Sequence, residues 1–149
     1  MKLAEALQER ADLNRKIEAL QTRLLNNCLV QEGEKTAEDP AELLFELNAC
    51  TARLSSLISM INLKNALTIC EGKTLTEMLA EKDALQQRLS IYRDIINTAS
   101  QTARRARGTE IRIMAAVDVR DLQKQADDMA KKLRLLDNKV QQINWTTEF

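Results

Sequence analysis

Apolar residues recur at alternating spacings of three and four positions in four windows of the chain, at residues 3–24, 43–61, 75–103 and 119–143. This spacing places the apolar side chains on one face of a helix and is typical of the seams of bundles and coiled coils. Further apolar residues, Leu7 and Ile95 among them, lie beside the seams and widen each stripe beyond that of an isolated two-stranded coil. The pattern therefore predicts several helices packed together as a bundle.

Residues with capping chemistry mark where two of these helices begin. Asp39 is a good N-cap, Pro40 suits the first helical position, and Glu42 completes a capping box. Asp118 has the same capping role before the fourth window, and Gly72 marks the break before the third. We therefore expect helices to start at Pro40 and directly after Asp118.

The connections between the windows complete the predicted fold. Helices of about 25 to 30 residues would each be roughly 40 Å long, and short connections make neighbouring helices antiparallel. Residues 29–31 and 111–114 favour β-structure, so they could pair as a short ribbon at one end of the bundle. The sequence predicts an all-α fold: an elongated antiparallel bundle of about four long helices with coiled-coil-like packing, with a short two-stranded β-ribbon as an option. We expect residues 1–149 to form a single domain.

The composition agrees with this fold. The chain of 149 residues has only 3 glycines and 1 proline, and residues that favour helices dominate. Its 22 basic and 22 acidic side chains balance, so any nucleic-acid site has to be local. A thin bundle has a large surface for its volume and gains by oligomerising. We therefore expect a homo-oligomer, with other protein partners as a further option.

The compartment is predicted from two features. No apolar run reaches the length of a membrane span, and the start, "MKLAEALQER", has no apolar segment typical of a signal peptide. We therefore expect a cytoplasmic protein, in which Cys28, Cys50 and Cys70 stay as thiols. Cys50 falls on an apolar stripe and is interpreted as a small hydrophobic residue. With no histidine and no CxxC pair, no metal or other cofactor is expected.

An arginine cluster is the first candidate binding site. Its four members could bind phosphate groups through charge-assisted contacts: Arg104, Arg105, Arg107 and Arg112. Alternatively, the arginines complement the dipole at a helix C-terminus that Gly108 ends. The second interpretation is favoured because no aromatic residues alternate with the arginines to stack on bases.

A polar cluster at one end of the bundle is the second candidate. Asn62 and Asn65 end the second window, and an antiparallel layout brings them toward the start of the first helix and toward Asn144 and Trp145. These residues could line a polar pocket, or the asparagines could fix the register of the helices, which is the favoured interpretation. Trp145 would then be an end plug or an anchor between copies.

Several segments together resemble a known family. They are "MKLAEALQERADLNRKI", "NNCLVQEGEKTAEDPAELL", "INLKN", "EIRIMAAVDV" and "NWTTEF". With them, the whole chain resembles a bacterial family of uncharacterised small helical proteins, some of which are labelled septicolysin. The resemblance implies a helical fold and brings no catalytic residue. The label implies a cytolysin, which the sequence does not support, since it shows no export signal and mutual packing accounts for its amphipathic faces.

Catalysis is not expected. The acidic residues have ordinary spacings for solvated helix faces, and the chain has no histidine to act as a base. The sequence therefore predicts a cytoplasmic, homo-oligomeric helical-bundle protein that acts as a structural or protein-interaction module without catalysis. The alternative is a nucleic-acid or anion-binding protein that uses the arginine cluster.

Overall fold

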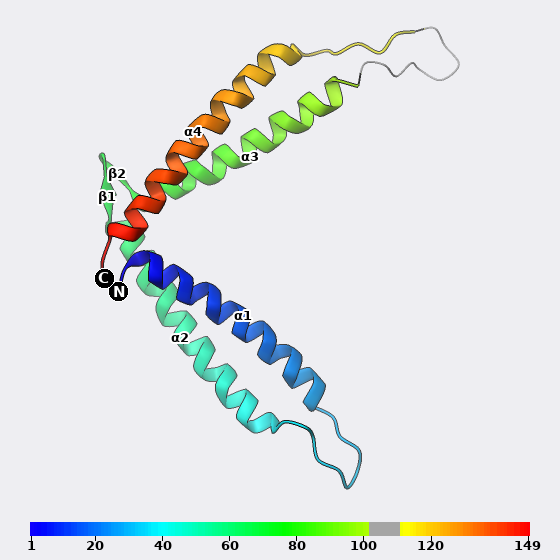
Figure 1. Ribbon diagram of the computed structural model, residues 1–149, viewed down its shortest axis with the longest axis vertical. Helices are drawn as coiled ribbons and strands as arrows, with labels where there is room; N and C mark the ends of the chain where they lie inside the picture. Colours follow the sequence, from blue (N-terminus) through cyan, green and yellow to red (C-terminus); the bar gives the residue numbers. More distant parts are fainter. Residues whose placement is uncertain (102–110) are drawn as a thin grey trace. The chain divides into compact units, whose positions relative to one another are not determined.

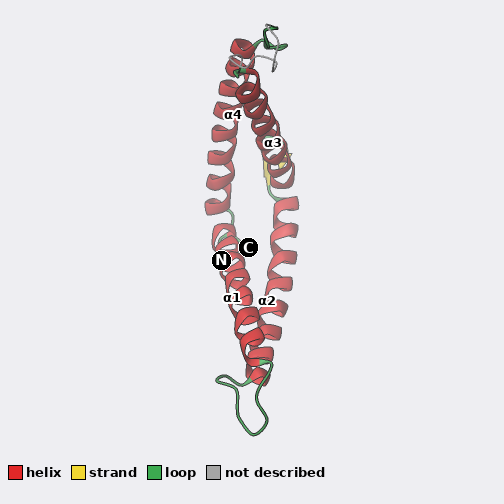
Figure 2. Cartoon of the chain, turned by 90° about the vertical axis from the view of Figure 1, so that its right-hand side faces the viewer, coloured by secondary structure: helices red, strands yellow, loops and turns green. Residues whose placement is uncertain are grey.

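The computed structural model describes residues 1–101 and 111–149. Four helices dominate this part of the chain: α1 (Leu3–Asn27), α2 (Pro40–Leu67), α3 (Leu75–Ala99) and α4 (Val119–Thr146) (Figure 1). The two short strands β1 (Ile69–Cys70) and β2 (Lys73–Thr74) lie between α2 and α3 and form a small antiparallel sheet (Figure 2). The predicted all-α class with four helices and a short ribbon is confirmed.

The helix starts agree with the capping pattern. Oδ1 of Asp39 accepts a hydrogen bond from the Ala41 N–H at 2.9 Å, and Pro40 is the first residue of α2. Oδ1 of Asp118 likewise accepts from the Asp121 N–H at 3.1 Å at the start of α4. Each cap supplies a partner for an N–H that the helix itself leaves unpaired, so the sequence fixes both boundaries locally.

The predicted end of the third helix and the predicted position of the ribbon are wrong. Helix α3 ends at Ala99 rather than continuing to residue 103, and the Ser100 hydroxyl turns back to donate to the Ile96 carbonyl at 2.7 Å. Residues 29–31 lie in a loop, while the ribbon forms at residues 69–74. Glu71 and Gly72, with φ angles of 51° and 80°, form its two-residue turn. Such a turn matches the twist of a hairpin and closes a very short loop, whereas the predicted pairing joined distant segments.

The chain groups into two compact units. Unit 1 consists of Met1–Thr74 with Ile143–Phe149, and unit 2 consists of Leu75–Gln142. Unit 1 therefore holds α1, α2, the ribbon and the last residues of α4, and unit 2 holds α3 and most of α4. The single domain expected from the sequence stays a prediction.

In unit 1, α1 and α2 lie side by side along their length (Figure 1). Leu20, Leu43 and Cys50 form a buried cluster between them, and the partly buried residues packed against it are Leu13, Ile17, Leu24 and Leu47. Cys50 is thus a small hydrophobic core residue, as its place on the stripe predicted. Charged pairs flank this core, with Arg53 Nε 2.6 Å from Glu9 Oε1 and Lys16 Nζ 2.7 Å from Glu46 Oε1.

In unit 2, α3 packs against α4. The buried residues Leu89, Ala126 and Met129 form the centre of this contact, and partly buried side chains surround them: Leu85, Tyr92, Ile96, Ala130 and Leu133. Lys82 on α3 forms an ion pair with Asp137 on α4. The seam positions that the heptad pattern identified thus form the core of each helix pair.

Candidate interaction sites

The predicted arginine site falls mostly outside the described part of the chain. Arg104, Arg105, Arg107 and Gly108 lie outside the described residues, and Arg112 is exposed. The phosphate-binding and helix-terminus interpretations both stay predictions.

Both ends of the chain meet in unit 1. The Leu3 N–H donates to the Thr147 carbonyl at 2.9 Å, and the Phe149 N–H donates to the Met1 carbonyl at 3.1 Å. Lys64, near the end of α2, places its Nζ 5.8 Å from the centre of the Phe149 ring, within the range of a cation–π contact. The end of α2, the start of α1 and the chain end therefore come together, as the antiparallel layout requires.

The four polar-cluster residues differ in exposure within this region. Asn144 is buried, Asn65 is half-buried and Asn62 is exposed. Trp145 keeps 47% of its surface exposed. The role of the asparagines in helix register, and that of Trp145 as a plug or an anchor, stay predictions.

A buried asparagine that the sequence pattern did not reveal fixes the loop between α1 and α2. The Asn27 Nδ2 donates to the Arg23 carbonyl at 2.8 Å, and its Oδ1 accepts from the Glu38 N–H at 3.0 Å. Arg23 Nε also lies 3.1 Å from both carboxylate oxygens of Glu38. These bonds raise the pKa of Arg23 and lower the pKa of Glu38. Loop 28–39 is thereby tied to the last turn of α1.

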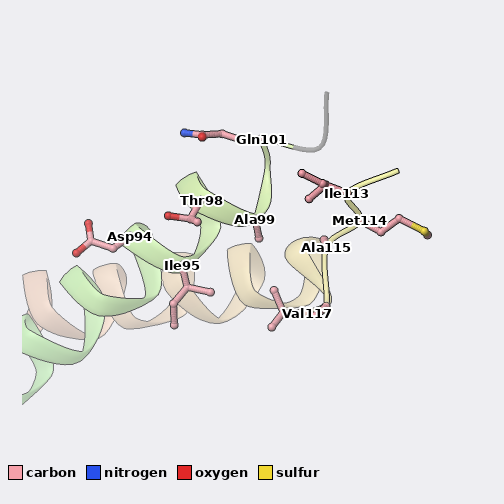
Figure 3. A pocket seen from close by; sticks show the side chains of 10 residues that line it. Asp94, Ile95, Thr98, Ala99, Gln101, Ile113, Met114, Ala115 and Val117 are labelled. Atoms are coloured by element: carbon pink, nitrogen blue, oxygen red, sulfur yellow. The ribbon is translucent and has the colours of Figure 1, made fainter. Parts of the chain in front are cut away.

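Unit 2 has an apolar groove at its surface. It has a volume of about 500 Å³, and it lies between the end of α3 and residues 113–117 (Figure 3). Large apolar side chains contribute much of its lining and stay partly exposed: Ile95 at 38%, Ile113 at 45%, Val117 at 41% and Met114 at 79%. Asp94, Thr98 and Gln101 add the polar rim. Such a groove can receive an apolar side chain from another molecule.

The electrostatics of the described residues are those of surface ion pairs. The hydrogen bond from Arg53 lowers the pKa of Glu9, and that from Lys82 lowers the pKa of Asp137. Across residues 1–101 and 111–149, His, Cys, Asp and Glu side chains nowhere gather in threes at a distance suited to a metal ion. In the same ranges, no helix combines the length and the apolar character needed to cross a membrane.

The described residues define an all-helical protein with an exposed apolar groove. The chain belongs to a family of unknown function, DUF6847, which matches residues 10–149. It is also similar to a functionally unknown conserved protein from Corynebacterium diphtheriae, whose crystal structure shares 40% sequence identity and a TM-score of 0.94. That match covers 100% of this chain and 98% of the other. No curated protein matches the chain.

These matches confirm the expected resemblance to a family of uncharacterised proteins. The septicolysin label that some members carry has no support from these matches. Sequence reasoning also missed the groove. Its signal was the apolar run at residues 113–117, which overlaps the segment 111–114 that favours β-structure.

Proposed function

We propose that this protein is a cytoplasmic, homo-oligomeric protein-interaction module that acts without catalysis. The observation that carries the proposal is the exposure of large apolar side chains on the helices and in the groove, such as Phe45 at 78%, Leu63 at 63% and Met114 at 79%. Exposed apolar surface of this kind marks sites where proteins bind one another, because contact removes it from water.

Two further features support the proposal. The three cysteines are free thiols, which suits a reducing compartment. Four acids form ion pairs with Arg or Lys that lower their pKa values: Glu9, Glu38, Glu46 and Asp137. Their pKa values are lowered, so they are poor proton carriers at neutral pH.

The test is the mass of the purified protein in solution, measured by light scattering on a sizing column with absorbance at 260 and 280 nm on the same peak. A multiple of 16.9 kDa with a protein spectrum is the expected result. A species of 16.9 kDa at every concentration up to about 100 μM would remove self-assembly from the proposal. A peak rich in 260 nm absorbance that disappears at high salt would instead favour the nucleic-acid alternative.

A further inference from the structure

We infer that a second copy of this chain docks on the face of α2 that points away from α1. This inference rests on the proposed function, because it assigns the surface through which the homo-oligomer forms. We call this surface the outer face of α2. Its large members are Leu44, Phe45, Ile58, Leu63 and Leu67, and its smaller members are Asn48, Ala49, Ala52, Ser55, Ser56, Ser59 and Ala66.

The outer face of α2 carries no charge. Helix α2 has four charged residues among its 28, whereas α4 has 10 among 28. At 100° per residue, all four charged residues fall on one side of the helix: Glu42, Glu46, Arg53 and Lys64. Glu46 and Arg53 form ion pairs with α1, and Lys64 contacts the Phe149 ring. The rest of the helix surface outside the core is left to apolar and small polar side chains.

The large residues of this face are open to solvent. Phe45 is 78% exposed, Leu63 63%, Leu67 67%, Leu44 48% and Ile58 38%. At roughly 150 Å² for a fully exposed side chain, the lower end of the range for aromatic residues, these five leave about 440 Å² in water. The seven smaller members are all exposed and add to this area, and a standard interface takes roughly 800 Å² from each partner. The outer face is therefore large enough for a stable dimer.

The charge pattern selects a second copy as the occupant. In a two-fold symmetric dimer the same patch lies on both sides, so a patch with charges of one sign would repel itself. The outer face of α2 meets its own copy without such repulsion. A strongly charged partner, in contrast, would find no complementary charge on this face and would lose its own hydration on binding.

The order of residues along the outer face fits an antiparallel pairing. Three pairs of residues on this face lie at equal sequence distances on either side of position 54. They are Phe45 with Leu63, Ala49 with Ser59, and Ala52 with Ser56. A two-fold axis at position 54 would thus set Phe45 of one copy beside Leu63 of the second copy at both ends of the contact. The small residues in the middle would let the two helices approach closely. Phe45 and Leu63 are about 27 Å apart along the helix at a rise of 1.5 Å per residue.

The first experiment changes the large residues. A variant with both Phe45→Glu and Leu63→Glu should keep its helical circular dichroism, because both side chains are exposed, and its dimer dissociation constant should rise at least 100-fold. The matched control is Leu135→Glu on α4, a leucine that is 54% exposed and lies outside this face. It should leave the mass unchanged.

The second experiment tests the register by disulfide formation, in a background with Cys28→Ser and Cys70→Ser and with the buried Cys50 kept. Ala52→Cys combined with Ser56→Cys should give covalent dimers on mild oxidation, since the pairing brings these positions within disulfide reach. Ala49→Cys alone should give no covalent dimer, because the two-fold axis places residue 49 of one copy about 15 Å along the helices from residue 49 of the other.

The outcomes separate this inference from the proposed function. The α2 interface would be overturned if the wild-type protein is an oligomer and the Phe45→Glu and Leu63→Glu changes leave its mass unchanged. A fall in mass with Leu135→Glu instead would overturn it as well. Either result would leave self-assembly intact. Equal cross-linking of the Ala49 variant and the Ala52/Ser56 variant would overturn the antiparallel register. A wild-type protein that is monomeric throughout would refute self-assembly itself and the interface with it.

Discussion

Replacing Asn27 by alanine tests whether its two hydrogen bonds hold loop 28–39 against α1. The side chain is 6% exposed, and it bonds to the Arg23 carbonyl and to the Glu38 N–H. A net contribution of about 0.5 to 1.5 kcal/mol per bond gives a loss of roughly 1 to 3 kcal/mol, because the Glu38 N–H and the Arg23 carbonyl lose a partner in a partly buried site.

The neighbouring Asn26→Ala is the matched control. Asn26 is exposed in the same helical turn, so the gain in helix propensity from asparagine to alanine is similar in both variants and cancels in their difference. The assay is urea unfolding followed by circular dichroism, with the exchange rate of the Glu38 amide hydrogen as a local readout. We expect Asn27→Ala to be less stable than Asn26→Ala by the amount above, and the Glu38 amide to exchange faster. Equal stabilities and equal exchange rates would refute the anchoring role.

Three further predictions follow from the core, the ion pairs and the ribbon. Leu20→Ala should lower the free energy of unfolding by about 2 to 5 kcal/mol, because Leu20 is fully buried, whereas Leu25→Ala, at a 68% exposed position, should change it far less in the same urea titration. Lys82 lowers the pKa of Asp137 below its usual value of 3.8. The ion pair therefore stabilises the folded state above pH 3.8, and this stabilisation is lost as the pH falls through the pKa that Asp137 has in the folded protein. Asp137→Asn should make the free energy of unfolding fall less on acidification. Gly72→Ala should lower the melting temperature and reduce stability by about 1 kcal/mol, since Gly72 has a φ of 80°, and an unchanged melting temperature would contradict the turn geometry.

The sequence predicted those parts of the fold that depend on local chemistry. Asp39 and Pro40 specify a helix start by themselves, so their boundary could be predicted without knowledge of the tertiary structure. The ribbon was misplaced because residues 29–31 and 111–114 have β-forming side chains, while the ribbon that forms depends on a tight turn at Glu71 and Gly72.

The candidate sites were harder to predict because their parts are far apart in the sequence or lack a repeating pattern. The groove joins Ile95 on α3 to Val117 before α4, and no spacing rule connects the two. Asn27 is one of two adjacent asparagines, and only the path of the following loop decides which of them is buried. The outer face of α2 is encoded in the sequence, but it becomes visible only when the position of α1 shows which face α2 buries.

The pairing of the two chain ends has a kinetic consequence. Unit 1 consists of Met1–Thr74 and Ile143–Phe149, so its N-terminal part is synthesised long before the segment that bonds to Leu3 and Met1. During translation, α1 and α2 can form their hairpin early, because their contacts are local. The bonds of Thr147 and Phe149 to the start of the chain close a loop that spans almost the whole sequence, and this closure is entropically slow. Unit 1 therefore stays incomplete until residues 143–149 have left the ribosome, and in that interval the start of α1 is accessible to chaperones and proteases.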